Sequence, residues 1–172
     1  MKKLTAYRLT PTDHPMLIER LRKLYVEALS HLATRKLHAN TEVEQQAWFN
    51  NLDHAAVALH LYSPVERPWE IVGFSQVTDR GNFCTPMFAL ARHMRGQGLG
   101  EEIILHYLKL ANGKPLHGEQ LVANGAICHL NERLGWQIKR EENGVQYLYH
   151  PNGTDWPQAA YDEIVRYHEE NQ

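Results

Sequence analysis

The stretch Arg95–Gly100, with the sequence Arg-Gly-Gln-Gly-Leu-Gly, constrains the fold of this chain more than any other. It follows a strand-like run, Phe83–Leu90, and leads into a helix-like run, Leu99–Leu110. Glycines at such a turn leave the backbone bare where the first helical amides lack partners and the helix dipole is positive. A phosphate or pyrophosphate group suits this position. The stretch therefore predicts a strand–loop–helix unit that binds a phosphate-bearing cofactor, although a turn that needs glycine only for close packing is the alternative.

Two common phosphate-binding loops do not fit this stretch. The Walker A pattern Gly-x-x-x-x-Gly-Lys-Ser/Thr is absent. The spacing is not the Gly-x-Gly-x-x-Gly of dinucleotide sites, and no acidic residue follows at the end of a next strand. What remains is Arg-x-x-Gly-x-Gly, with Leu90 five residues before Arg95. This pattern resembles the pyrophosphate loop of the GNAT family of N-acyltransferases, which bind acetyl-CoA.

A second motif, Asn124–Trp136, lies downstream at the spacing that the same family uses. It resembles the family's Asn-led helix ending in Gly-Phe, with Trp136 as the first residue of the next strand. Asn124 can cap this helix, and the apolar residues recur at helical spacing. An ordinary amphipathic helix would explain the apolar face but not the two motifs in this order. By element order the resemblance covers about residues 4–150, and its specific motifs lie within residues 88–136.

Composition bounds the class of protein. A chain of 172 residues with 43% hydrophobic residues is expected to form one domain with a substantial core. The net charge of −2 argues against nucleic acid or an anionic membrane as a partner. The longest apolar run, Ala55–Leu59, is too short to cross a bilayer. No apolar segment typical of a secretory signal follows Lys2 and Lys3, which favours a cytoplasmic location. The eleven histidines and two cysteines show no metal-ligand spacing, so we expect no metal.

Periodicity and turn residues predict the element order β-α-α-β-β-β-α-β-α-β-β. This order indicates an α/β fold with a mixed sheet covered by helices, and it is also the order of the GNAT fold. The resemblance implies a mostly antiparallel twisted sheet with helices on both faces. The expected strands are 4–9, 55–62, 69–78, 83–90, 116–123, 136–141 and 144–149, and the expected helices begin near Pro15, Thr41, Leu99 and Asn124. Residues 1–150 would form the GNAT-like domain. Residues 151–172 would add a C-terminal helix that packs on it.

The resemblance implies that acetyl-CoA, or another acyl-CoA, is the co-substrate. It would lie where two parallel strands diverge, one ending near Leu90 and the other near Ala123. A backbone N–H near Leu90 would stabilise the oxyanion as an amine attacks the thioester. Arg92 is either a further phosphate contact or a solvated surface residue. The implied cofactor-binding residues are Phe88, Ala89 and Leu90 for the pantetheine arm, Gly96, Gln97, Gly98, Leu99, Gly100 and Glu101 for the pyrophosphate, and Arg95, Asn124 and Asn131.

Two residues are candidates for the catalytic steps. An attacking amine must be neutral, so a base is useful. Glu119, five residues before Asn124, stands where several family members place a glutamate base, the alternative being an exposed strand carboxylate. Asn131 stands where the family commonly has a tyrosine that protonates the leaving thiolate, and an amide cannot act as a general acid. Asn131 would donate a hydrogen bond to sulfur, or Tyr147, Tyr149 or water would supply the proton, or the protein would bind CoA without turnover.

The acceptor site is expected opposite the cofactor, near the connection between the first two helices. The candidates are Arg35, Lys36, His38, Trp48, Phe49 and Gln76, of which we select Arg35, Trp48 and Gln76. The basic residues of this connection suggest an acidic or phosphorylated acceptor, or are simply solvated.

The leading interpretation is an acetyl-CoA-dependent N-acetyltransferase acting on a primary amine of a small molecule or protein. A cofactor-binding regulatory or interaction module without turnover is the alternative, and an acyltransferase for a protein terminus or a nucleobase is the third. No basic stripe with interleaved aromatic residues supports nucleic acid. A homodimer stays open, as do the identities of the acceptor and of the acyl group.

Overall fold

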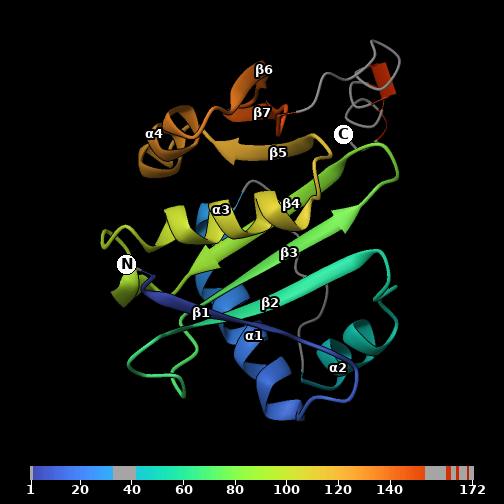
Figure 1. The fold of residues 1–172 in the computed structure, drawn as a ribbon, viewed down its shortest axis with the longest axis vertical. Coiled ribbons are helices and arrows are strands. Elements are labelled where there is room, and N and C mark those ends of the chain that lie inside the picture. The colour runs from blue at the N-terminus through green and yellow to red at the C-terminus, as the bar shows by residue number, and fades with distance from the viewer. Residues whose placement is uncertain (1, 33–41, 154–161, 164–165, 167–169, 171–172) are drawn as a thin grey trace.

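The computed structural model describes residues 2–32, 42–153, 162–163, 166 and 170 (Figure 1). Its seven strands form one sheet in the order β1-β2-β3-β4-β5-β7-β6, and every neighbouring pair is antiparallel except β4 and β5. The predicted fold class, a mixed and mostly antiparallel sheet covered by helices, is confirmed. The strands are β1 (Leu4–Arg8), β2 (Val57–Pro64), β3 (Gly73–Asp79), β4 (Cys84–Leu90), β5 (Leu116–Leu121), β6 (Gln137–Glu142) and β7 (Val145–His150). The helices are α1 (Pro15–Ala28), α2 (Glu42–Asn50), α3 (Leu99–Leu110) and α4 (Gly125–Arg133), with short 3-10 turns at Leu29–His31 and Arg92–Met94.

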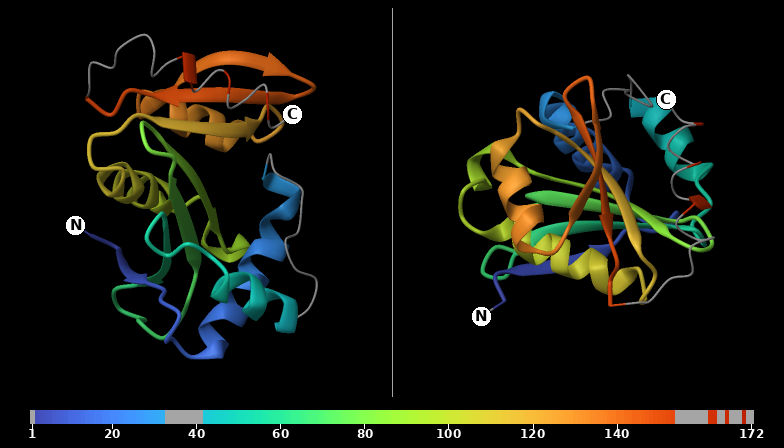
Figure 2. Two further views of the ribbon diagram at one scale, coloured as in Figure 1. Left: turned by 90° about the vertical axis from the view of Figure 1, so that its right-hand side faces the viewer. Right: turned by 90° about the horizontal axis from the view of Figure 1, so that it is seen from above.

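Helices α1 and α3 cover opposite faces of the β2–β4 part of the sheet (Figure 2). Successive side chains of a strand point to opposite faces, so neighbouring residues of β3 meet different helices. Phe74 lies with its ring centroid 6.0 Å from that of Tyr25 on α1. A Cβ atom at the adjacent Gly73 would lie 3.3 Å from Ile103 on α3. The core is thus two apolar layers, one on each side of the sheet.

Two strands differ most from the expectation. The strand expected at 55–62 runs from Val57 to Pro64, because the residues predicted to turn still pair with β1, Ser63 opposite Thr5. The strand expected from Trp69 begins only at Gly73. Consecutive turns, in which the amides of Arg67 and Glu70 donate to carbonyls three residues earlier, occupy the intervening segment. Trp69, 74% exposed, therefore belongs to a hairpin connection and not to the sheet.

Local backbone chemistry follows the sequence at other points. Helix α3 has the predicted bounds, and the predicted turn between β6 and β7 has Asn143 at φ 51° and Gly144 at φ 77°, as a two-residue hairpin requires. Asn124 occupies the N-cap position of α4, but its side chain makes no capping hydrogen bond, contrary to the prediction. The expected helix start at Thr41 and most of residues 151–172 lie outside the described residues. Within the described part of the chain, none of the helices combines the length and hydrophobicity needed to cross a membrane.

Candidate active site

Strands β4 and β5 pair only where they begin. The register contains a single parallel pair, Cys84 with Leu116, next to a hydrogen bond of 2.9 Å from the Cys84 amide to the Pro115 carbonyl. Beyond that point β5, β7 and β6 turn away from the rest of the sheet, as Figure 2 shows. A strand that loses its neighbour leaves alternate N–H and C=O groups without ladder partners. The divergence therefore opens a backbone edge of β4, toward Leu90, to a ligand.

A cavity of about 650 Å³ fills this divergence, which we call the cleft. Its walls come from both halves of the sheet, from the glycine loop before α3, from α4 and from the end of α1. Most of the residues that the resemblance implies for the cofactor line the cleft, and Gln97 is not among the lining residues. Those that do are Phe88, Ala89, Leu90, Arg95, Gly96, Gly98, Leu99, Gly100, Glu101, Asn124 and Asn131, together with Glu119. The cleft thus gathers residues from segments that lie far apart in the sequence.

The glycine loop forms one end of the cleft. Gly96 has φ 75°, and Gly98, the N-cap of α3, has φ 77°, in the left-handed region that side-chain-bearing residues avoid. A Cβ atom at either position would meet nothing within 4 Å, so backbone conformation and not crowding requires glycine there. By position, the amides of the first turn of α3 have no intrahelical acceptor. The loop and helix start therefore offer a concave set of N–H donors suited to an anion.

Two side chains of the loop are turned toward its own backbone. Arg95 donates from Nε to the Leu90 carbonyl over 3.1 Å, and Gln97 donates from Nε2 to the His93 carbonyl over 3.1 Å. Arg92 is exposed, and its backbone amide donates a hydrogen bond to the Glu27 carboxylate. These bonds fix the shape of the loop. Arg95 also lines the cleft, where its positive charge favours an anion.

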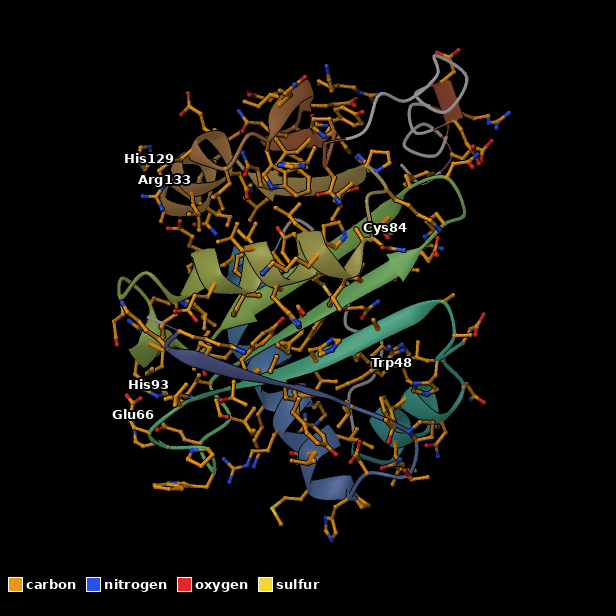
Figure 3. All side chains as sticks on the ribbon, viewed as in Figure 1. Trp48, Glu66, Cys84, His93, His129 and Arg133 are labelled. Atoms are coloured by element: carbon orange, nitrogen blue, oxygen red, sulfur yellow. The ribbon has the colours of Figure 1, made fainter. Side chains whose placement is uncertain are left out.

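An ion pair joins the loop to α4. Arg133 and Glu101, which both line the cleft, form a salt bridge between the last turn of α4 and the first turn of α3. Figure 3 shows Arg133 on α4, above the α3 helix. Both side chains are substantially exposed, so the pair contributes little stability. Its position makes it a part of the cleft rim that a ligand would meet.

Glu119 and its neighbours form the wall contributed by β5. The side chain reaches solvent through the cleft, and the surrounding walls raise the pKa of its carboxyl through partial desolvation. In the register of β5 with β7, Glu119 lies directly opposite Tyr147, and His117 lies opposite Tyr149. A carboxylate with a raised pKa holds a proton more strongly than an ordinary glutamate, as a general base must.

Two buried polar atoms of the cleft wall have no hydrogen-bond partner among the described residues. They are the acceptor Oδ1 of Asn131 and the donor Nε1 of Trp136, and both residues are 6% exposed. The Nδ2 group of Asn131 is already used, because it donates to Gln120 Oε1 over 2.7 Å. Buried polar groups are rarely left unpaired, since an unmade hydrogen bond costs free energy. One acceptor and one donor complement the N–H and C=O of an amide-containing ligand.

Asn124 connects the two sides of the cleft. Its Nδ2 group donates to the His31 carbonyl over 3.4 Å, across from the end of α1. His31, Leu32 and Ala28 also line the cleft. The sequence had given no sign that these residues lie there, because nothing local relates the end of one helix to the start of another.

The predicted acceptor residues that the structure describes do not line the cleft. Arg35, Lys36 and His38 fall outside the described residues. Trp48 on α2 (Figure 3) and Gln76 on β3 are not among the cleft-lining residues. Gln76 does pair across the sheet with Met87, and Met87 lines the cleft. Their role in binding an acceptor remains a prediction.

Two further residues of the cleft wall have no distinctive signal in the sequence. Gln120 and Trp136 line the cleft, yet a glutamine in a strand carries no signal, and the motif predicts Trp136 only as the start of the next strand. No group of three or more histidine, cysteine, aspartate or glutamate side chains within the described parts of the chain could hold a metal ion.

Comparison with known proteins gives structural matches alone. No family model matches the chain, and no curated protein matches by sequence. A spermidine N-acetyltransferase from Vibrio cholerae, solved with CoA and spermine, is 17% identical at a TM-score of 0.66, over 86% of this chain and 94% of that one. A GNAT-superfamily phosphinothricin acetyltransferase from Sinorhizobium meliloti, solved with acetyl-CoA, is 15% identical at a TM-score of 0.69, over 87% and 89%. The protein yncA from Salmonella typhimurium, solved with its cofactor acetyl-CoA, is 13% identical at a TM-score of 0.69, over 91% and 98%. The chain therefore has the fold of the GNAT acetyltransferases.

Proposed function

We propose that this protein is an N-acetyltransferase that moves an acetyl group from acetyl-CoA to a primary amine of a small molecule. The observation that carries the proposal is the cleft between β4 and β5, which has a glycine-rich helix start at one end and the Glu119 carboxylate in its wall. The solved structures that share this fold, among them acetyltransferases for spermidine and phosphinothricin, support a small amine as the acceptor.

The residues of the cleft fit acetyl-CoA. The positive φ of Gly96 and Gly98 exposes loop amides to a pyrophosphate without any side chain in the way. The open edge of β4 from Phe88 to Leu90 can pair with the amides of a pantetheine arm. The unpartnered Oδ1 of Asn131 and Nε1 of Trp136 supply a further acceptor and donor. We propose that these groups, with Arg95 and Asn124, hold the co-substrate.

When bound, acetyl-CoA supplies an activated acyl thioester, and this chain's residues do the rest. Glu119 accepts a proton from the incoming ammonium, directly or through water, because its pKa is raised by the cleft walls. A backbone N–H of β4 near Leu90 donates to the thioester oxygen as it gains negative charge. The amine then attacks the thioester directly, with both substrates in the cleft together.

The leaving thiol needs no dedicated acid. Asn131 cannot give up a proton, and one hydrogen of its Nδ2 group is already bonded to Gln120. A thiol with a pKa near ~8.5 departs largely as the thiolate, so a tyrosine at this position is not required for turnover.

The direct test is release of free CoA thiol from acetyl-CoA in the presence of a panel of small primary amines. Mass spectrometry should find an N-acetylated amine in equal amount to the CoA released. The Glu119→Gln variant should bind acetyl-CoA like the wild type and turn over more slowly. If the wild type binds acetyl-CoA but transfers nothing to any amine, the binding-module alternative replaces this proposal. If it binds no acetyl-CoA, the assignment fails at its first step.

A further inference from the structure

Four polar side chains form a continuous row from the protein surface to the cleft wall. Glu141, Gln146 and Gln120 lie side by side on β6, β7 and β5, because each is the direct cross-strand partner of the next. Asn131 extends the row from α4. The row begins at the exposed Glu141 and ends with Gln120 at 4% and Asn131 at 6% exposure.

Hydrogen bonds connect each member of the row to the next. Gln146 donates from Nε2 to Glu141 Oε2 over 2.8 Å, and Gln120 donates from Nε2 to Gln146 Oε1 over 2.8 Å. Asn131 donates from Nδ2 to Gln120 Oε1 over 2.7 Å. Each of the three amides thus donates toward the surface, and Gln146 and Gln120 also accept from the side of the cleft.

The direction of this row is set at its outer end. A carboxylate can only accept hydrogen bonds, so Gln146 must present its NH₂ group to Glu141 and its oxygen to Gln120. Gln120 must then present its NH₂ group to that oxygen and its own oxygen to Asn131. Each amide orients the next, as in a polarised chain of hydrogen bonds.

We propose that Glu141, acting through Gln146 and Gln120, orients the Asn131 amide so that its Oδ1 atom remains a free acceptor in the cleft wall for an N–H group of the pantetheine arm. Glu141 is in this sense a positioning residue, since it acts only through others. Oδ1 of Asn131 and Nε1 of Trp136 then give the cleft wall one acceptor and one donor, whereas the reversed row would give it two donors. The ligand half of this inference rests on the proposed function.

The test reverses the row from its outer end. Lysine can only donate, so Glu141→Lys should turn Gln146, then Gln120, then Asn131, and leave the Asn131 NH₂ group in place of Oδ1. Glu142→Lys is the matched control, with the same charge change on the next residue of β6, whose carboxylate contacts Arg140 instead. Both sites are exposed, so both variants should fold.

Neutron diffraction on ligand-free, deuterated crystals separates N–D₂ groups from oxygen atoms and reads the direction of the row without any ligand. Calorimetry then measures the dissociation constant for CoA. We expect the amides to reverse and the dissociation constant to rise about tenfold in Glu141→Lys, with neither change in Glu142→Lys.

Three results would overturn the inference: a wild-type row in the opposite direction, an unchanged row in Glu141→Lys, or a reversed row with unchanged CoA affinity. Failure of the wild type to bind CoA at all has a different meaning. It refutes the proposed function and the ligand half with it, while the neutron result still decides whether Glu141 directs the row.

Discussion

Replacing Gly98 with alanine separates the backbone role of the glycine loop from its role in binding. Gly98 has φ 77° and ψ 6°, and a Cβ atom there would meet no atom within 4 Å. The substitution therefore introduces no clash. Its cost is the left-handed conformation itself, about 1 kcal/mol for a residue with a Cβ atom. For a chain of this length, that should lower Tm by about 2–4 °C.

The effect on binding should be larger than the effect on stability. Relaxation of residue 98 toward negative φ would turn the loop amides away from the position of the pyrophosphate. Loss of one hydrogen bond to a charged group is worth about 1.5–3 kcal/mol, which corresponds to a rise in the dissociation constant for acetyl-CoA of about tenfold or more. Calorimetric titration of acetyl-CoA into both proteins measures this directly.

Gly81→Ala is the matched control. Gly81 has φ 91° and equally open space at Cβ, but it lies in the turn between β3 and β4 and not in the cleft wall. Both variants should lose similar stability, and only Gly98→Ala should lose affinity for acetyl-CoA. Wild-type affinity in Gly98→Ala would refute the assignment of the loop amides to the pyrophosphate, and an unchanged Tm would refute the strain argument.

Three further changes test other parts of the site and the core. Because the cleft walls raise the pKa of Glu119, the rate of acetyl transfer should rise with pH through a midpoint above the ~4.3 of an ordinary glutamate. If the pH–rate profile of Glu119→Gln keeps the same rise, Glu119 is excluded as the base. Trp136→Phe removes the unpartnered Nε1 donor, so the free energy of unfolding should change by less than about 1.5 kcal/mol, while the dissociation constant for acetyl-CoA should rise about fivefold. Equal affinities of the two proteins in a calorimetric titration would contradict a role for that donor. Burial lowers the pKa of His60 to about 4, so the unfolded chain binds more protons than the folded one below pH ~6.5, and stability should fall as pH drops from there toward 4. A His60→Asn variant with the same slope of Tm against pH would show that other groups cause this loss of stability.

The sequence by itself determined the local elements that carry strong backbone signals. Helix α3 follows from the glycines before it and the apolar periodicity within it, and the β6–β7 hairpin follows from Asn143-Gly144. These signals are local because φ preference and helix capping depend on a few neighbouring residues. The fold class followed from the order of such elements, and the same glycine loop indicated the end of the cleft where an anion would bind.

Only the tertiary structure decided how distant segments combine. Nothing local relates Asn131 on α4 to Gln120 on β5 and Glu141 on β6, yet sheet register brings them into one hydrogen-bonded row. The same is true of His31, whose carbonyl accepts a hydrogen bond from Asn124. Strand pairing and side-chain burial depend on contacts between residues far apart in the chain, so a pattern read along the sequence cannot fix them. Asn131 read alone is a missing tyrosine, whereas in the fold it is the inner end of a hydrogen-bonded row.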